Sequence, residues 1–98
     1  MTRENALKCL AANKDKLKDF AVARLAIFGS VARDQARADS DIDILVEYEP
    51  DARVGLFAFV RLQRFLSELL GARVDLATPA ALRPEMKDQI LREAIRAA

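Results

Sequence analysis

Two aspartates, Asp41 and Asp43, are separated by a single isoleucine in the segment DIDILVEY. In a β-strand every second side chain projects from the same face, about 6.6–7 Å along the chain, so both carboxylates would point the same way. They would repel by roughly 4 kcal/mol if the charges came within about 4 Å at an effective dielectric near 20. A divalent cation removes this repulsion. Mg²⁺ prefers oxygen ligands, and it is usually bound by carboxylates together with substrate phosphates. The spacing therefore predicts a metal site.

A third carboxylate, Asp75, lies in the short apolar segment ARVDLAT, where Val74 and Leu76 are expected to face the core. If this strand lies beside the strand of the aspartate pair, three carboxylates converge. Such a set can hold two metal ions about 3.5–4 Å apart, an arrangement that clamps both oxygens of an in-line phosphoryl displacement.

Gly29 and Ser30 directly follow the apolar run LAIF. A glycine lets a phosphate approach the backbone, and a serine at the start of a short helix offers a hydroxyl and an amide to an anion. Together with a metal site, this turn predicts binding of a nucleoside triphosphate. Each motif alone has an ordinary explanation, as a turn or as surface carboxylates, but their combination in strand–turn–helix–strand order favours the functional interpretation.

The periodicity of apolar residues predicts the elements that would position these groups. Helices are expected over residues 4–20, 54–70 and 84–97, strands over 23–28, 41–48 and 72–78, and one or two helical turns over 31–36. Gly71 should end the second long helix, and Thr78-Pro79 resembles a helix cap followed by a first-turn proline. The order α-β-α-β-α-β-α predicts one α/β (α+β) domain over residues 1–98, with a small mixed sheet and flanking helices.

The composition, 52% hydrophobic and 32% charged residues, is typical of a soluble globular domain. No segment is apolar enough to cross a membrane, and a single cysteine cannot form an internal disulfide, so we expect a cytoplasmic protein. The net charge of +1 gives no reason to expect direct binding of nucleic acid. Residues 38–51 nevertheless carry six acids and no base. A solvated acidic loop explains Asp39, Glu49 and Asp51, but not the pair within the apolar strand.

The segment FGSVARDQARADSDIDILV, in which Gly-Ser is followed after ten residues by Asp-x-Asp, resembles the signature of the DNA polymerase β-like nucleotidyltransferase superfamily. It is most similar to the minimal nucleotidyltransferases, the MNT-type antitoxins. The resemblance implies a polymerase β-like nucleotidyltransferase fold and the binding of two Mg²⁺ or Mn²⁺ ions with ATP as substrate. It implies that Asp41 and Asp43 bind both metals and that Asp75 binds the catalytic metal and helps to activate the acceptor hydroxyl. Gly29 and Ser30 would hold the triphosphate.

Two neighbouring residues bear on this resemblance. Arg33 matches the arginine often found in GSxAR, and it either neutralises phosphate charge or forms a structural ion pair with a nearby acid. Asp34 stands where the family commonly has glycine. A carboxylate facing the triphosphate would oppose binding, so we expect Asp34 to point to solvent.

The resemblance also implies a partner, because minimal nucleotidyltransferases are typically encoded with a HEPN-domain toxin. The implied reaction moves AMP from ATP to a tyrosine hydroxyl of that toxin and silences it. Two alternatives stay open: a non-catalytic module that neutralises the toxin by contact, and an antibiotic nucleotidyltransferase. Homo- and hetero-oligomers both stay open. The wide apolar surface of helix 54–70 fits either a partner-binding role or a deeply buried central helix.

Overall fold

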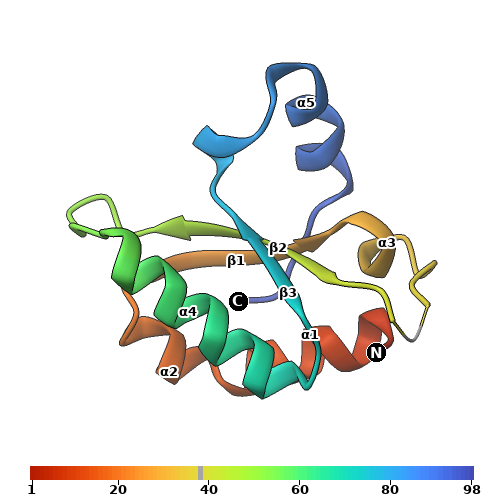
Figure 1. The fold of residues 1–98 in the computed structure, drawn as a ribbon, viewed down its shortest axis with the longest axis horizontal. Coiled ribbons are helices and arrows are strands. Elements are labelled where there is room, and N and C mark those ends of the chain that lie inside the picture. The colour runs from red at the N-terminus through yellow and green to blue at the C-terminus, as the bar shows by residue number, and fades with distance from the viewer. Residues whose placement is uncertain (38) are drawn as a thin grey trace.

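The computed structural model describes residues 1–37 and 39–98 (Figure 1). The helices are α1 (Arg3–Ala12), α2 (Lys14–Lys18), α3 (Gly29–Ala32), α4 (Leu56–Leu70), the 3₁₀ helix η1 (Pro79–Ala81) and α5 (Pro84–Glu93). The strands are β1 (Val22–Phe28), β2 (Ile42–Tyr48), β3 (Val74–Ala77) and β4 (Ile95–Arg96). Within these residues, no helix is long and apolar enough to cross a membrane.

The strands form a four-stranded mixed sheet in the order β3-β2-β1-β4. β1 runs antiparallel to β2 and to β4, whereas β2 and β3 are parallel. A parallel pair needs a long crossover connection, which α4 supplies between β2 and β3. This architecture confirms the predicted α/β fold class with a mixed sheet.

The hydrophobic core lies between the sheet and three helices. α1, α2 and α4 lie together on one side of the sheet, and α5 stands on the other side (Figure 1). Strand alternation turns Ile42, Ile44 and Val46 of β2 inward, and all three are at most 1% exposed. α4 meets them with Leu62 and Leu66, which are fully buried one helical turn apart. The opposite face of β2 is therefore left for Asp43 and its neighbours.

The first predicted helix is wrong as a single element, because the chain forms α1 and α2 with a break at Asn13. The Asn13 side chain donates a hydrogen bond to the backbone carbonyl of Cys9 at 2.8 Å. Asparagine competes in this way with the regular helical hydrogen bonds. Leu10 and Leu17 are both buried on either side of the break, so the apolar pattern that suggested one helix is retained.

The last helix is also shorter than predicted, since α5 ends at Glu93 and β4 follows. Ile95 pairs with Ile27 of β1, and the Ala97 amide donates to the Leu25 carbonyl at 2.8 Å. These hydrogen bonds satisfy the edge of β1 and outweigh the helical propensity of the alanine-rich tail. Thr78-Pro79 begins a 3₁₀ helix, and the Thr78 side chain makes no capping hydrogen bond.

α4 ends as predicted at Gly71, which adopts the left-handed conformation with φ 64°. Its buried residues are Leu62, Leu66 and Leu70. At its N-terminal end, however, Leu56 is 74% and Phe57 is 81% exposed. The interpretation of α4 as a deeply buried helix is therefore wrong for this end, and the partner-binding interpretation stays a prediction.

Candidate active site

The turn from β1 into α3 brings Gly29 against Asp43. Phe28, the last residue of β1, is the register partner of Asp43 in β2. Gly29 has φ 70°, and a Cβ atom built on it would overlap the Asp43 carboxylate and lie 3.0 Å from its Cγ. Glycine is needed here both for the left-handed backbone and for the close approach of the carboxylate.

The second strand pairing brings the predicted carboxylates together. Asp43 of β2 and Asp75 of β3 are register partners in the parallel pair, as expected if the two strands are adjacent. Asp41 directly precedes β2, and Asp41 and Asp75 are both exposed while Asp43 is half-buried. Asp43 and Asp75 thus lie side by side on adjacent strands, Asp41 directly precedes β2, and the Asp43 carboxylate lies against Gly29.

The negative charges of this cluster act on Asp43 most strongly. Burial and the neighbouring charges of Asp75 and Asp41 raise the pKa of Asp43 from 3.8 to about 6. Arg33 lowers the pKa of Asp43, and Glu93 raises it again by a smaller amount. A divalent cation bound beside Asp43 would oppose this rise in pKa and displace the proton.

Replacing Asp43 by asparagine is therefore expected to stabilise the metal-free protein near pH 7.5. Because the folded-state pKa is raised to about 6, the folded protein binds this proton more tightly than the unfolded chain does. The resulting stabilisation is complete below pH 3.8 and is lost as the pH rises through about 6. Asparagine cannot ionise, so the variant does not lose this stability as the pH rises. Its advantage in stability over the wild type is therefore largest at neutral pH and shrinks toward pH 4.

The difference between 3.8 and about 6 corresponds to roughly 3 kcal/mol, which partial exposure reduces to about 1–2 kcal/mol. Thermal unfolding in EDTA should show a midpoint about 4–10 °C higher for Asp43→Asn near pH 7.5. Asp51→Asn removes an exposed turn carboxylate and serves as the matched control. Equal midpoints for the wild type and Asp43→Asn at this pH would contradict the electrostatic description.

The donor chemistry fits a hard divalent cation, because all three predicted ligands are carboxylates. Among the described residues, no three aspartate, glutamate, cysteine or histidine side chains are gathered tightly enough to hold a metal ion as they stand. Asp41 and Asp75 are exposed and free to rotate toward Asp43. Asp41, Asp43 and Asp75 therefore stay the predicted ligands of Mg²⁺ or Mn²⁺.

The predicted phosphate side of the site already holds an anion of the protein itself. The Gly29 amide donates to Glu93 Oε1 at 3.2 Å, and Arg33 Nη1 donates to Glu93 Oε1 and Oε2 at 3.1 and 3.2 Å. Of the two roles open to Arg33, the ion pair with a nearby acid is therefore present. Ser30, the other predicted phosphate-binding residue, is half-buried in the same turn.

Glu93 was not among the residues predicted from the sequence. The sequence contained one indication of its role. Glu93 lies at the C-terminal end of α5, where the helix dipole favours cations over anions. An acid at this position indicates a partner elsewhere in the fold, but the sequence does not identify Gly29 and Arg33 as that partner.

Asp34 is exposed, as predicted, and its backbone has φ 58°. Aspartate tolerates this left-handed conformation better than most residues, and glycine adopts it freely. A glycine would fit the same backbone, and the exposure of Asp34 agrees with the prediction that its side chain points to solvent.

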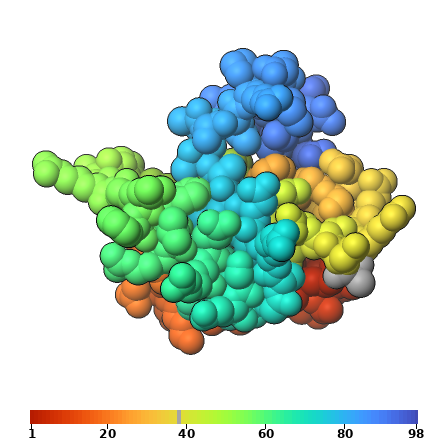
Figure 2. Space-filling model, in the orientation of Figure 1, coloured from red at the N-terminus to blue at the C-terminus, as the bar shows by residue number. Residues whose placement is uncertain are grey.

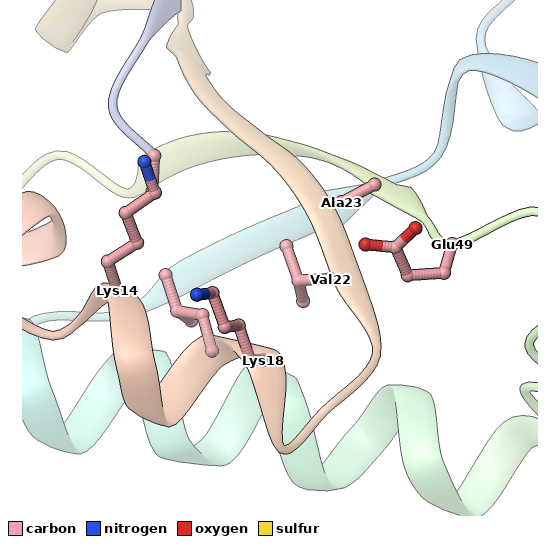
Figure 3. Close-up of a pocket in the computed structure, with 7 residues that line it drawn as sticks. Lys14, Lys18, Val22, Ala23 and Glu49 are labelled. Atoms are coloured by element: carbon pink, nitrogen blue, oxygen red, sulfur yellow. The ribbon is translucent and has the colours of Figure 1, made fainter.

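One pocket lies away from the predicted site, and another is bordered by a residue of that site. A pocket of about 130 Å³ lies between α2 and β1 and is lined by Lys14, Lys18, Val22, Ala23 and Glu49, among others (Figure 3). None of the predicted site residues lines it. Asp41 instead borders an open depression of about 300 Å³, together with Arg73. The acidic cluster therefore lies at the surface, where a large acceptor can reach it.

Comparison with known proteins identifies the family of this chain. A family model described as a nucleotidyltransferase domain matches residues 8–97. The protein adenylyltransferase MntA of Thermococcus cleftensis is 38% identical over 96 residues, which cover 97% of this chain and 95% of that protein. A solved structure described provisionally as a minimal nucleotidyltransferase is 39% identical, with a TM-score of 0.80 over 97% of this chain and 95% of its own.

A more distant solved structure is similar to this chain in fold only. The similar chain belongs to the structure of the tri-AMPylated HEPN toxin of Shewanella oneidensis in complex with MNT antitoxin. That chain is 20% identical and has a TM-score of 0.64 over 94% of this chain and 71% of its own. The predicted minimal nucleotidyltransferase fold is thereby confirmed.

Proposed function

We propose that this chain, which belongs to the nucleotidyltransferase domain family, moves AMP from ATP to a hydroxyl group of a partner protein. We infer that the partner is a HEPN-domain toxin and the acceptor a tyrosine, so that the chain acts as an antitoxin. The adenylyltransferase name of the Thermococcus relative supports the AMP transfer. The AMPylated HEPN toxin in the Shewanella complex supports the partner.

One observation carries the proposal: Asp43 and Asp75 are register partners on parallel strands, and Asp43 packs against Gly29. The carboxylates and the phosphate-binding turn therefore meet at one point on the surface. In-line transfer of a nucleotidyl group fits this juxtaposition, because one triphosphate can then place its leaving phosphates on the anion-binding turn and its α-phosphate beside the acidic residues.

The proposed reaction forms a bond between the acceptor oxygen and the α-phosphorus of ATP. The bond from that phosphorus to the oxygen bridging the α- and β-phosphates breaks, and pyrophosphate leaves. Bound divalent ions would stabilise negative charge on the attacking and leaving oxygens. We assign the acceptor proton to Asp75, which is exposed and therefore accessible to an incoming hydroxyl. Gly29 and Ser30 would hold the leaving phosphates through their amides.

The open position of the cluster suggests how a small domain reaches its acceptor. Asp41 and Asp75 are exposed, so this chain alone does not exclude water from the predicted site. A protein acceptor that docks over the aspartates would both deliver its hydroxyl and displace water. Catalysis should therefore depend on the complex with the partner.

The proposed function is tested by incubating the purified chain with ATP, Mg²⁺ and a HEPN-domain toxin. Intact-mass spectrometry of the toxin should show added AMP, and fragmentation should place it on a tyrosine. Chelation of the metal by EDTA should prevent the modification. A toxin that stays unmodified in the complete reaction contradicts the proposal, and if it is nevertheless neutralised, the chain is a non-catalytic binding module.

A further inference from the structure

Glu93 makes the contacts that a bound anion would make at the predicted phosphate turn. Its Oε1 accepts from the Gly29 amide at 3.2 Å, and both of its oxygens accept from the Arg33 guanidinium. The Glu93 side chain is 20% exposed, whereas that of Arg33 is 45% exposed. The Glu93 carboxylate thus occupies the Gly29 amide and neutralises the charge of Arg33, the two groups that a phosphate would bind.

The helix that carries Glu93 is held by few apolar contacts. Of the ten residues of α5, all of which the structure describes, Ile90 alone is buried. Met86 and Leu91 are 49% and 43% exposed. α5 and η1 form a lobe that projects from the rest of the molecule (Figure 2).

The contact between α5 and the sheet is also incomplete. A pocket of about 160 Å³ is lined by Leu91 and Ala94 on one side and by Leu45 and Glu47 on the other. By contrast, β4 is fixed to β1 by strand pairing directly after Ala94. Elements with little apolar burial open at low cost, so α5 can swing away while the chain end stays in the sheet.

We propose that Glu93 is a built-in competitor of nucleotide: its carboxylate occupies the place of a phosphate at Gly29 and Arg33, and α5 moves aside when ATP binds. This inference rests on the proposed function, because it takes the Gly29 turn as the triphosphate site. The apparent affinity for ATP is then reduced by the fraction of molecules in which Glu93 is seated.

Removing the carboxylate should therefore strengthen nucleotide binding. Glu93→Gln keeps the size of the side chain, removes its charge and frees Arg33 for phosphate. We expect the Kd of ATP with Mg²⁺ to fall by about two- to fivefold, the upper part of the range for loss of a partly exposed ion pair. Glu85→Gln is the matched control, because it makes the same chemical change at an exposed position in the first turn of α5. Its Kd should equal that of the wild type.

Isothermal titration calorimetry on the full chain measures these constants, and thermal unfolding confirms that each variant is folded. Glu93→Asp, whose shorter side chain keeps the charge but loses reach, is a second variant and should show an intermediate affinity. Hydrogen exchange provides a separate readout: the amides of α5 in the wild type should exchange faster with ATP bound than without it.

The two ideas fail in different ways. If the wild type binds ATP and Glu93→Gln binds it equally well or more weakly, the competitor role is overturned, and weaker binding would indicate instead that Glu93 orients Arg33 for phosphate. Slower exchange of α5 in the presence of ATP would overturn it as well. If none of these proteins binds ATP, the proposed function fails and this inference fails with it.

Discussion

An Asp41→Asn/Asp43→Asn double variant is expected still to bind the partner protein but to transfer almost no AMP. The two carboxylates lie at the start of β2 beside Asp75 and Gly29, and asparagine keeps their shape while removing their charge. Neutral amides bind divalent cations more weakly than carboxylates do. The rate of transfer should fall by about 10³-fold or more, the scale for loss of a preorganised electrostatic group.

The control for this variant is Glu49→Gln/Asp51→Asn, which removes two exposed carboxylates at the other end of β2. It changes the net charge by the same amount and should leave transfer unchanged. Partner affinity is measured by calorimetry and transfer by mass spectrometry of the co-expressed partner. Full modification of the partner by the aspartate double variant would show that these carboxylates do not carry the chemistry.

Local patterns in the sequence were sufficient to predict that Asp43 and Asp75 lie on two strands, which are adjacent in the structure. The alternation of apolar residues around Asp43 and Asp75 places both side chains opposite the core, and the structure has the two strands adjacent and in register. Gly29 was predicted for close approach of a phosphate, and a Cβ atom at this position would overlap the Asp43 carboxylate. Whether the triphosphate also contacts this turn stays a prediction.

The features that the sequence did not predict all depend on contacts between distant residues. Glu93 meets Gly29 and Arg33 across about sixty positions of the chain, and no periodic pattern encodes such a pair. β4 exists because the edge of β1 has unpaired backbone groups to offer Ile95, whereas the local sequence favours a helix. The break at Asn13 is local, but it depends on one side-chain hydrogen bond to Cys9, which an apolar pattern does not reveal.

Gly29→Ala is expected to lower AMP transfer by about 10²-fold while the domain stays folded. A methyl group at Gly29 overlaps the Asp43 carboxylate, so Asp43 must rotate away from the turn. A displacement of about 1 Å at a reacting centre costs on the order of 10²-fold in rate. The left-handed backbone, with φ 70°, adds a cost of about 1–2 kcal/mol in stability for any residue with a Cβ atom.

Gly71→Ala separates these two effects. Gly71 has φ 64°, and a Cβ atom built on it meets nothing within 4 Å. Both alanine variants should therefore unfold at a midpoint lowered by about 4–10 °C, because both force alanine into the left-handed region. Since the two variants share this strain, a loss of transfer in Gly29→Ala that Gly71→Ala does not show must come from the displaced Asp43. If the two variants instead lose transfer to the same extent, reduced stability explains the loss and the contact between Gly29 and Asp43 has no catalytic importance.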